Sequence, residues 1–558
     1  MKRQTLGIWA RTLSAVVVAA SLGGIATTAC DPVDRNFENT GGSGGSGGFG
    51  GSGQVCEPGT SEACYTGTPG TEDIGACKRG THTCLPSGMG YDECGGEVVP
   101  TTEICTTAID EACDGPNPVE CPPLAHVWSK SFGGMGEDAT TALAVDPATG
   151  DVIVTGYFRN TIDFGGNPMG STGSNDIFLA RFTADGTHLW SKRFGDAENQ
   201  SAAAIVLDST GAIYIGGDVF GSVDFGDGKP VTSKGSRDAF VAKFDPNGNV
   251  IWSRLFGDAG AQEVKDLAIT PTNQIIVAGN FDGLIPLSGM ELPSTNNSTD
   301  MFVIKLDQSG FDIGAKRYGG IGLDELSDVA VDSQGGVLLA GRFVDPIDFG
   351  SLGMFPSAGG DDGFVLKLKA NLTEEYARIY GDADSQNIDA VVALPNDDVF
   401  VLGDFGGSVN LGDGTIFTAP PQERSVFYVA LNANGSLKNG KQFTTTMLPF
   451  FRASVTVDPF TKSLVMTGFF GGTIDFGNGP RKADFADGFV AKFAFDGSHL
   501  ASASYGGPSI DAIFKSAVSP TGDIFACGGH SGPVDFGGGE LPAPGPDDVQ
   551  ALLMRLLP

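Results

Sequence analysis

From His126 to the C-terminus, short apolar runs alternate with turns rich in glycine, asparagine and aspartate, in units of about 62 residues. Each unit has an aromatic strand that ends in glycine, as in Trp128 to Gly133. Three further strands recur in each unit: an apolar strand that ends at a turn, a strand such as Ile213 to Gly217, and a strand such as Asp238 to Phe244. Runs of this length between Asn-Gly and Asp-Gly turns predict antiparallel hairpins.

Four short strands per unit are typical of one blade of a β-propeller. The aromatic strand and the strand of the Asp238 to Phe244 type each occur seven times. The first aromatic strand lies near Val127, and the last strand of the other type lies near Leu552 to Leu556. Because these two types form a hairpin in every internal unit, the first and last strands are expected to pair and remove exposed sheet edges. The predicted fold is all-β: a seven-bladed β-propeller of four-stranded antiparallel blades over residues 126–558, closed by pairing of its N- and C-terminal strands.

The strand Trp-Ser-Lys-x-Phe-Gly, with the hairpin Asp-x-x-Gly-x-Ile/Val-x-Ile/Val-x-Gly, resembles the SBBP (seven-bladed β-propeller) repeat family of bacterial surface and secreted proteins. The resemblance covers residues 126–558. That family has no agreed catalytic residues, so the resemblance implies no catalytic site.

The N-terminus predicts an export signal over residues 1–29. Lys2 and Arg3 precede an apolar run from Leu13 to Ile25 that is short for a membrane span. The sequence from Thr27 to Cys30 resembles a bacterial lipobox, with Thr27 where leucine is usual, and this implies lipidation of Cys30. Lipid chains would anchor the protein in the cell envelope, at the outer membrane or the cell surface. The alternative is an ordinary cleaved signal with Cys30 as an unmodified thiol.

Residues 30–53 hold a Gly/Ser tether, and residues 54–125 form a cysteine-rich module. Many cysteines in a short exported segment predict a disulfide framework, whose connectivity the sequence leaves open. The eight cysteines are Cys56, Cys64, Cys77, Cys84, Cys94, Cys105, Cys113 and Cys121.

This module resembles one found before repeat domains in myxobacterial surface proteins, through Cys56-Glu57-Pro58-Gly59 and Glu111-Ala112-Cys113-Asp114-Gly115. The resemblance implies a metal-binding motif in the last stretch. Its usual acidic run is replaced here by Thr106 to Asp110, so we expect a structural disulfide module, with metal binding as the alternative.

A net charge of −33 excludes nucleic acid and anionic lipid as electrostatic partners, because both need a basic surface. Contact with a membrane is therefore expected only through the lipid anchor, and the protein is expected to be a monomer.

Acidic residues gather in the loops from each aromatic strand to the next unit, and we interpret them as turn caps. No cofactor is predicted; calcium bound by these oxygens is the alternative. They are Glu137, Asp138, Asp196, Glu198, Asp258, Glu263, Asp324, Glu325, Asp382, Asp384 and Asp511.

The sixth of these loops is apolar instead, with Met447, Leu448, Phe450 and Phe451. Exposed, these side chains would contact a partner; buried, they would pack against the neighbouring blade.

These patterns predict a surface-anchored binding or scaffold protein that uses a propeller face to engage an unknown protein or polysaccharide, and not an enzyme. The alternatives are a propeller lyase or hydrolase, and a metal-binding surface protein acting through the cysteine-rich module. Non-repeating polar residues gathered in a pocket on one face would favour the enzyme.

Overall fold

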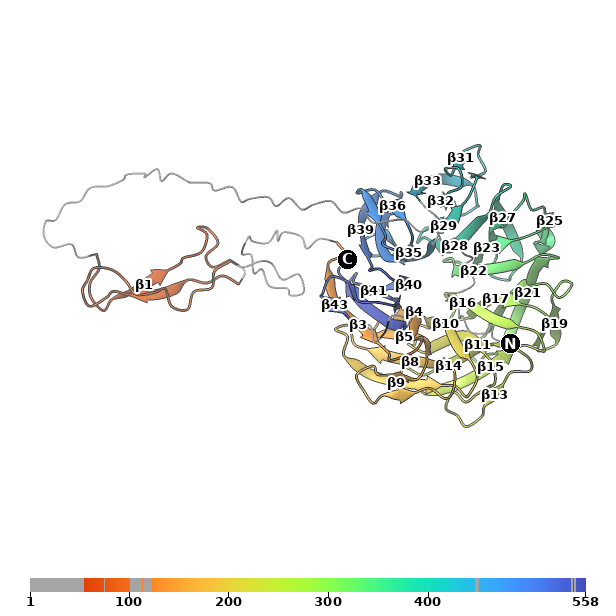
Figure 1. Ribbon diagram of the computed structural model, residues 1–558, viewed down its shortest axis with the longest axis horizontal. Coiled ribbons are helices and arrows are strands. Elements are labelled where there is room, and N and C mark those ends of the chain that lie inside the picture. The colour runs from red at the N-terminus through yellow and green to blue at the C-terminus, as the bar shows by residue number, and fades with distance from the viewer. Residues whose placement is uncertain are drawn as a thin grey trace, which may run out of the picture. The chain divides into compact units, whose positions relative to one another are not determined.

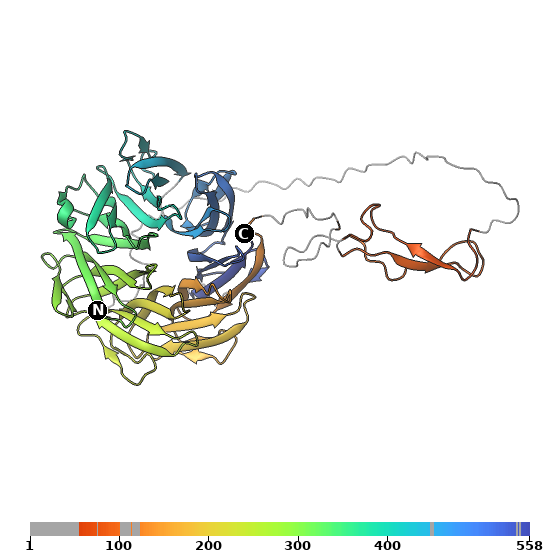
Figure 2. The same ribbon diagram turned by 180° about the vertical axis from the view of Figure 1, so that it is seen from behind.

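Antiparallel β-sheets make up the chain from His126 onward in this computed structural model. The structure describes residues 55–74, 76–100, 113, 123–446, 451–542, 545 and 548–558. Figure 1 shows the sheets placed around a common centre, and the view from behind in Figure 2 agrees. From innermost to outermost strand they are sheet A (β4-β5-β8-β9), B (β10-β11-β14-β15), C (β16-β17-β20-β21), D (β22-β23-β26-β27), E (β28-β29-β32-β33), F (β34-β35-β38-β39) and G (β40-β41-β44-β3).

The inner strands lie nearest the centre and the second strands pair with them. The inner strands are β4 (Ala139–Val145), β10 (Gln200–Leu207), β16 (Gln262–Ile269), β22 (Asp324–Val331), β28 (Gln386–Ala393), β34 (Phe451–Asp458) and β40 (Asp511–Val518). The second strands are β5 (Val152–Phe158), β11 (Ile213–Val219), β17 (Ile275–Phe281), β23 (Val337–Phe343), β29 (Val399–Phe405), β35 (Ser463–Phe470) and β41 (Ile524–His530).

The third strands carry the Phe-Val-Ala-Lys-Phe pattern, and the outer strands carry the aromatic pattern. The third strands are β8 (Asp176–Phe182), β14 (Asp238–Phe244), β20 (Asp300–Leu306), β26 (Asp362–Leu368), β32 (Ser425–Leu431), β38 (Asp487–Ala494) and β44 (Gln550–Leu556). The outer strands are β9 (His188–Phe194), β15 (Val250–Phe256), β21 (Asp312–Gly320), β27 (Glu374–Tyr380), β33 (Leu437–Thr446), β39 (His499–Tyr505) and β3 (His126–Phe132).

A small hairpin lies between the second and third strands of each sheet. The hairpins are β6 (Thr161–Ile162) with β7 (Met169–Gly170), β12 (Ser222–Val223) with β13 (Val231–Thr232), β18 (Leu284–Leu287) with β19 (Met290–Pro293), β24 (Ile347–Asp348) with β25 (Met354–Phe355), β30 (Ser408–Asn410) with β31 (Ile416–Thr418), β36 (Thr473–Asp475) with β37 (Pro480–Lys482), and β42 (Val534–Asp535) with β43 (Glu540–Leu541). A 3-10 turn spans Gly350–Leu352.

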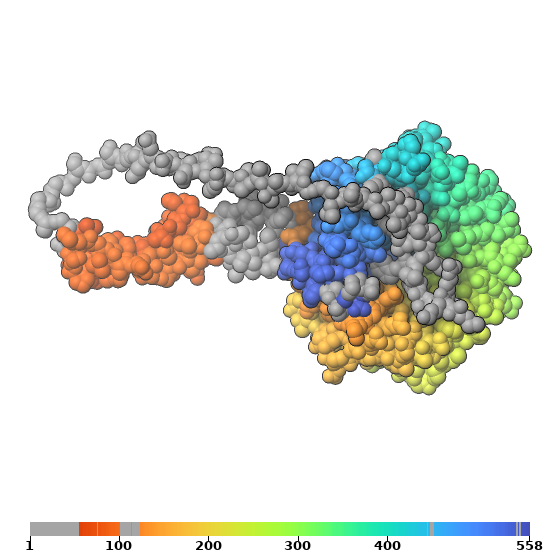
Figure 3. All heavy atoms as spheres, viewed as in Figure 1, coloured from red at the N-terminus to blue at the C-terminus, as the bar shows by residue number. Residues whose placement is uncertain are grey.

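Sheet G brings the two ends of this region together. β3, which opens it, pairs antiparallel with β44, which ends it, so that Phe132 lies opposite Ala551. The inner strands also contact one another in the order β4, β10, β16, β22, β28, β34, β40, and β40 contacts β4. Figure 3 shows these sheets, from orange through green to blue, packed side by side.

The second and third strands form the core because the neighbouring sheets cover both of their faces. All seven residues of β8 and of β11 are buried, which explains why apolar residues fill most of their positions without alternating with polar ones. A short Ile/Val-Asp-Phe-Gly element recurs after the second strand and has a packing and turn role, as at Asp224 and Phe225. Asp224 Oδ1 accepts backbone N–H groups from Gly226 and Gly228 at 2.8 and 3.1 Å, and Phe225 packs 5.1 Å from Phe240, ring centre to ring centre.

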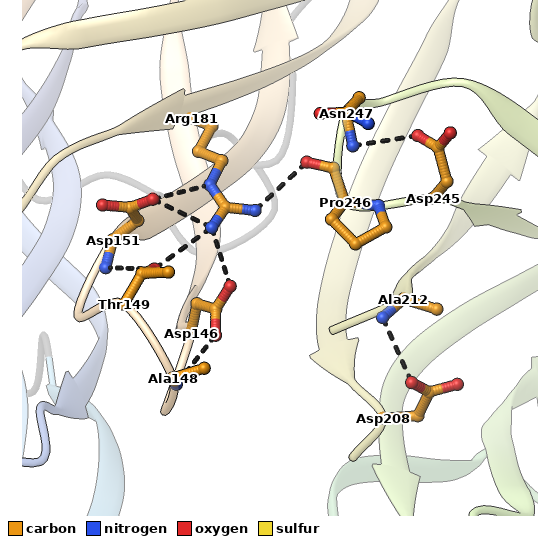
Figure 4. Close-up of polar contacts among 10 residues, drawn as sticks. All are labelled: Asp146, Ala148, Thr149, Asp151, Arg181, Asp208, Ala212, Asp245, Pro246 and Asn247. Atoms are coloured by element: carbon orange, nitrogen blue, oxygen red, sulfur yellow. Dashed lines mark hydrogen bonds and ion pairs between the residues drawn. The ribbon is translucent and has the colours of Figure 1, made fainter. Parts of the chain in front are cut away.

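A basic residue of the third strand joins sheets A, B, C and G to the sheet that follows each of them. Figure 4 shows Arg181 of sheet A donating to Asp146 Oδ2 at 2.7 Å and to the carbonyl of Pro246, in a turn of sheet B, at 3.1 Å. Lys243 and Lys305 reach the following sheets in the same way. The recurring lysine of the sequence pattern is therefore a structural residue.

The cysteine-rich segment contains the short pair β1 (Ser61–Cys64) and β2 (Gly80–Thr83). The predicted disulfide framework is present for six cysteines, while Cys105 and Cys121 lie outside the described residues. The bonds are Cys56–Cys84, Cys64–Cys94 and Cys77–Cys113. Where the chain is described, we find no helix with the length and apolarity needed to cross a membrane.

Candidate functional site

Neighbouring sheets meet in a repeated contact at the upper face, which we define as the face where the inner strands begin. The contact, which we call the latch, lies between the first residue of a third strand and the residue at the start of the next inner strand, which in sheet A is Asp138, directly before β4. Between sheets A and B these residues are Asp176 and Gln200, and a Cβ added at Gly195 would collide with both. The pairs in these positions elsewhere are Asp238 and Gln262, Asp300 and Asp324, Asp362 and Gln386, Asp487 and Asp511, and Gln550 and Asp138.

Burial raises the pKa of the latch carboxyl groups. The pKa rises to about 7 for Asp138, Asp324 and Asp511. It rises to about 6 for Asp176 and Asp487, from the same cause. These carboxyl groups therefore carry protons at mildly acidic pH, and a protonated carboxyl can donate a hydrogen bond to a facing oxygen.

The junction of sheets E and F departs from this pattern. Its latch positions hold Ser425 and Phe451 in place of a carboxyl group and its partner. Gln442 Nε2 donates to Ser425 Oγ at 3.0 Å, and the Phe451 ring stacks on Phe489 with ring centres 5.9 Å apart. β34 also pairs with β35 without the bulge that interrupts the other six pairs of inner and second strands.

Charged and amide side chains occupy this irregular junction, and we call Asn387, Asp389, Asp404, Arg424 and Arg452 the E–F cluster. Arg424 Nε donates to Asp404 Oδ2. Asn387 Nδ2 donates to Asp389 Oδ1 at 2.8 Å, while the buried Asp389 Oδ2 has no hydrogen-bond partner in the structure. Burial first, and then the Asp404 carboxylate, raise the pKa of Asp389 well above its usual range; the Arg452 and Arg424 charges oppose this.

Arg452 differs from the other members because its side chain is exposed. It lies on β34 directly opposite Phe469 of β35, which is half-buried. The cluster therefore offers, side by side, a guanidinium group, an aromatic ring and hydrogen-bonding groups.

The same row of positions is charged in sheets B to D as well. Arg237 Nη1 lies 3.8 Å from both Asp218 Oδ2 and Glu263 Oε2, and Arg342 binds Glu325. Arg237 thereby joins sheet B to sheet C, whereas Arg342 pairs with carboxylates of its own sheet, and both guanidinium groups are held by ion pairs.

An ion-pair network of one lysine and two aspartates spans the centre of the group of sheets, below the upper face. Lys515 Nζ lies 3.1 Å from Asp266 Oδ2 and 3.2 Å from Asp328 Oδ1. Lys515 is on β40, whereas the two aspartates are on β16 and β22, sheets that do not adjoin sheet G. We call this contact the crossbar. By register, the equivalent residues of the other inner strands are Ala142, Ala204, Ala390 and Ser454.

At the opposite face, the ends of four inner strands line an open cavity of about 320 Å³, with Ile269, Val331, Ala393 and Val457 among its walls. Its carboxylate, Asp332, is neutralised by Lys367. The cavity therefore has both apolar and polar walls, and its carboxylate is held in an ion pair.

Of the residues predicted to contact a partner, Phe451 belongs to the E–F junction and is half-buried there. Met447, Leu448 and Phe450 lie outside the described residues, as does Cys30. Sequence reasoning missed the E–F cluster and Lys515. Comparison of equivalent repeat positions would have singled out Arg452 and Lys515, which replace small or acidic residues.

Two of the acidic loop residues act as the predicted turn caps. Asp196 Oδ1 accepts the Glu198 N–H at 2.9 Å and Oδ2 accepts the Ser222 N–H at 2.7 Å; Asp382 does the same in sheet E. Within the described ranges, no three His, Cys, Asp or Glu side chains are placed to hold a metal ion together.

The sheets define the class of architecture, an all-β fold of the β-propeller type. No family model matches the chain, so the finer resemblance to SBBP repeats stays a prediction.

The chain is 25% identical over 324 residues to the regulatory protein FlaEY of Caulobacter vibrioides, covering 52% of this chain and 32% of that protein. It is 23% identical over 155 residues to an uncharacterized WD repeat-containing protein of Acanthamoeba polyphaga mimivirus, covering 25% of this chain and 11% of that protein. The chain thus spans a third or less of the length of these relatives. Among solved structures, a chain of the mitotic checkpoint complex is similar with a TM-score of 0.39 and 12% identity, over 74% of this chain and 92% of that one.

Proposed function

We propose that this protein is a binding or scaffold protein, and that the upper face at the junction of sheets E and F engages a protein or glycan partner. The proposal rests on the ways in which this junction differs from the other junctions between neighbouring sheets. Ser425 and Phe451 replace the latch, β34 lacks the bulge, and polar groups including exposed Arg452 take their place. Elsewhere the repeated residues serve the fold.

Binding is favoured over catalysis because the polar groups of the cluster other than Arg452 are held by hydrogen bonds to one another. Arg424 is paired with Asp404, and Asp389 is bonded to Asn387. A propeller lyase or hydrolase stays the alternative, since the raised pKa of Asp389 is a property that general acids share.

In this proposal the fold is a closed seven-bladed β-propeller of SBBP type, supported by the pairing of β3 with β44 and by the sequence repeat. The protein is a monomeric lipoprotein anchored in the cell envelope through Cys30. Mass spectrometry of the N-terminal peptide from envelope-extracted protein tests the anchor: acyl chains on Cys30 are expected, and an unmodified thiol would contradict it.

The binding role is tested with the full chain on a glycan array and in pull-downs from envelope extracts. Partners that bind the wild type are then offered to R452E and to the control R159E. Arg159 is exposed at the upper face of sheet A, away from the cluster. Loss of binding for R452E alone is expected. The proposal fails if the chain retains no partner, or if both variants bind as well as the wild type.

A further inference from the structure

A serine and a histidine form a hydrogen-bonded pair in sheet G that the other sheets lack. Ser131 Oγ of β3 lies 2.8 Å from His530 Nε2 of β41. His530 Nδ1 lies 2.8 Å from the carbonyl oxygen of Gly532. Because a carbonyl oxygen only accepts hydrogen bonds, Nδ1 carries the hydrogen of the neutral ring, and the Ser131 hydroxyl group donates to Nε2.

The repeat shows that the fold does not need this pair. The residues that occupy the position of His530 in the other second strands are apolar: Phe158, Val219, Phe281, Phe343, Phe405 and Phe470. Sheet F has a serine in the position of Ser131, which is Ser504 of β39, but Phe470 stands there in place of the histidine. A buried polar ring in an apolar position therefore calls for a reason other than packing.

We propose that Ser131 is a catalytic nucleophile with His530 as its general base, and that the pair hydrolyses a small uncharged carboxylic ester. This inference is independent of the binding role proposed for the E–F junction, because it concerns other residues in another sheet.

The reaction balances with water as the only co-reactant. As Ser131 Oγ bonds to the carbonyl carbon of the ester, His530 Nε2 takes the hydroxyl proton. The C–O bond to the alcohol then breaks, and the imidazolium gives the proton to the leaving oxygen. Water, deprotonated by the same Nε2, cleaves the acyl-serine, releases the carboxylic acid and restores the Ser131 hydroxyl group.

The surroundings of the pair suit these roles. His530 is fully buried, and this burial lowers its pKa, so that the imidazole is neutral and accepts a proton near neutral pH. Ser131 is half-buried on β3, the outermost strand of sheet G, so a ligand can reach it from the rim (Figure 1). An edge strand also presents backbone N–H groups, which are donors that stabilise a developing oxyanion. The Phe536 ring lies 6.2 Å from the His530 ring, centre to centre, and this apolar neighbour favours an uncharged substrate.

The test compares two serines of the full chain after treatment with a fluorophosphonate, a probe that phosphonylates serines activated by a base. Mass spectrometry of the peptides follows the label on each serine with time. Ser504 is the matched control, because it is also half-buried, occupies the equivalent strand position and has no histidine beside it. Since a general base contributes about 10²–10⁴-fold to a rate, we expect Ser131 to be labelled at least about 100-fold faster than Ser504.

Variants assign the reactivity to the pair. H530F introduces the phenylalanine that most other sheets have in this position, so we expect it to fold and to label Ser131 as slowly as Ser504. Hydrolysis of p-nitrophenyl acetate should be lost in S131A and in H530F and kept in S504A. Circular dichroism and thermal melting check that each variant is folded.

Equal labelling of Ser131 and Ser504, no label on either serine, or unchanged labelling of Ser131 in H530F would each overturn the inference. Hydrolysis by the wild type no faster than by S131A would overturn it as well, because the acyl-serine would then not be formed or not be turned over. None of these outcomes affects the binding role of the E–F junction, which R452E tests separately.

Discussion

Replacing Lys515 by methionine should destabilise the ring of sheets, because it leaves the two aspartates of the crossbar without their cation. The side chains of Asp266 and Asp328 are 14% and 8% exposed, and that of Lys515 is 31% exposed. Removing one partner of a fully buried pair costs about 3–5 kcal/mol, and of a surface pair about 0–1 kcal/mol. The partial exposure of Lys515 places the expected cost between these limits, at about 2 kcal/mol.

That free energy converts to a small shift in melting temperature. Unfolding entropy near 60 °C is about 2.1 cal/mol/K per residue, so a sheet region of this length loses only about 2 °C in Tm. Differential scanning calorimetry resolves this difference, and K515R, which keeps the charge, serves as the control.

A second variant separates the charge effect from lost packing. In K515M/D266A/D328A no buried charge is left unpaired, so its Tm should recover to within about 0.5 °C of the wild type or exceed it. The reasoning is refuted if K515M melts like the wild type, or if the triple variant melts lower than K515M.

Three further predictions concern the latch and the disulfides. The pKa values of Asp138, Asp324 and Asp511 are raised to about 7, so the folded state binds protons more tightly than the unfolded state. The contribution of these groups to stability is therefore lost as pH rises from about 4 to 7. The Tm at pH 5 should exceed the Tm at pH 8. An equal or higher Tm at pH 8 would contradict this. G195A should lower the free energy of unfolding by at least about 2 kcal/mol in urea titrations, because its Cβ collides with the latch; a change under 0.5 kcal/mol would count against the contact. The Cys56–Cys84 bond closes a loop with a sequence separation of 28, and breaking it in C56S/C84S should cost the module about 4 kcal/mol through chain entropy. The expected result is faster limited proteolysis of the variant. Unchanged proteolysis would show that the bond is dispensable.

The sheets could be predicted from the sequence because each strand repeats a local signal. Continuous apolar runs mark the second and third strands, and Asp-Gly or Asn-Gly turns mark their ends. The third-strand lysine was visible in the repeat, but its role was not, since Lys243 bonds the Gln308 carbonyl of the next sheet at 3.3 Å. Such a contact depends on how sheets pack, which a single repeat does not encode.

The candidate site could be predicted only in part, for the same reason. The apolar loop that ends at Phe451 pointed to the junction at which the E–F cluster lies, and its role as a partner contact stays a prediction. The cluster around Asp389 joins residues of several strands, and Lys515 meets Asp266 at a sequence separation of 249. Contacts of this kind follow from the order of the sheets around the centre and are not contained in local sequence.

The latch and the cluster together explain why the E–F junction can differ from the others without loss of the fold. At a regular junction the latch contains a buried carboxyl group, and loss of either partner would leave a buried polar group without a hydrogen bond, so each latch resists substitution. Ser425 and Phe451 remove both partners at once, which leaves no carboxyl group unsatisfied, and the stacking of Phe451 on Phe489 supplies apolar packing instead. Freed from the latch, the adjoining positions tolerate Arg452 at the surface and Asp389 beneath it. Because the sheets on either side keep their own contacts, this junction can change its side chains while the packing of the other sheets stays the same.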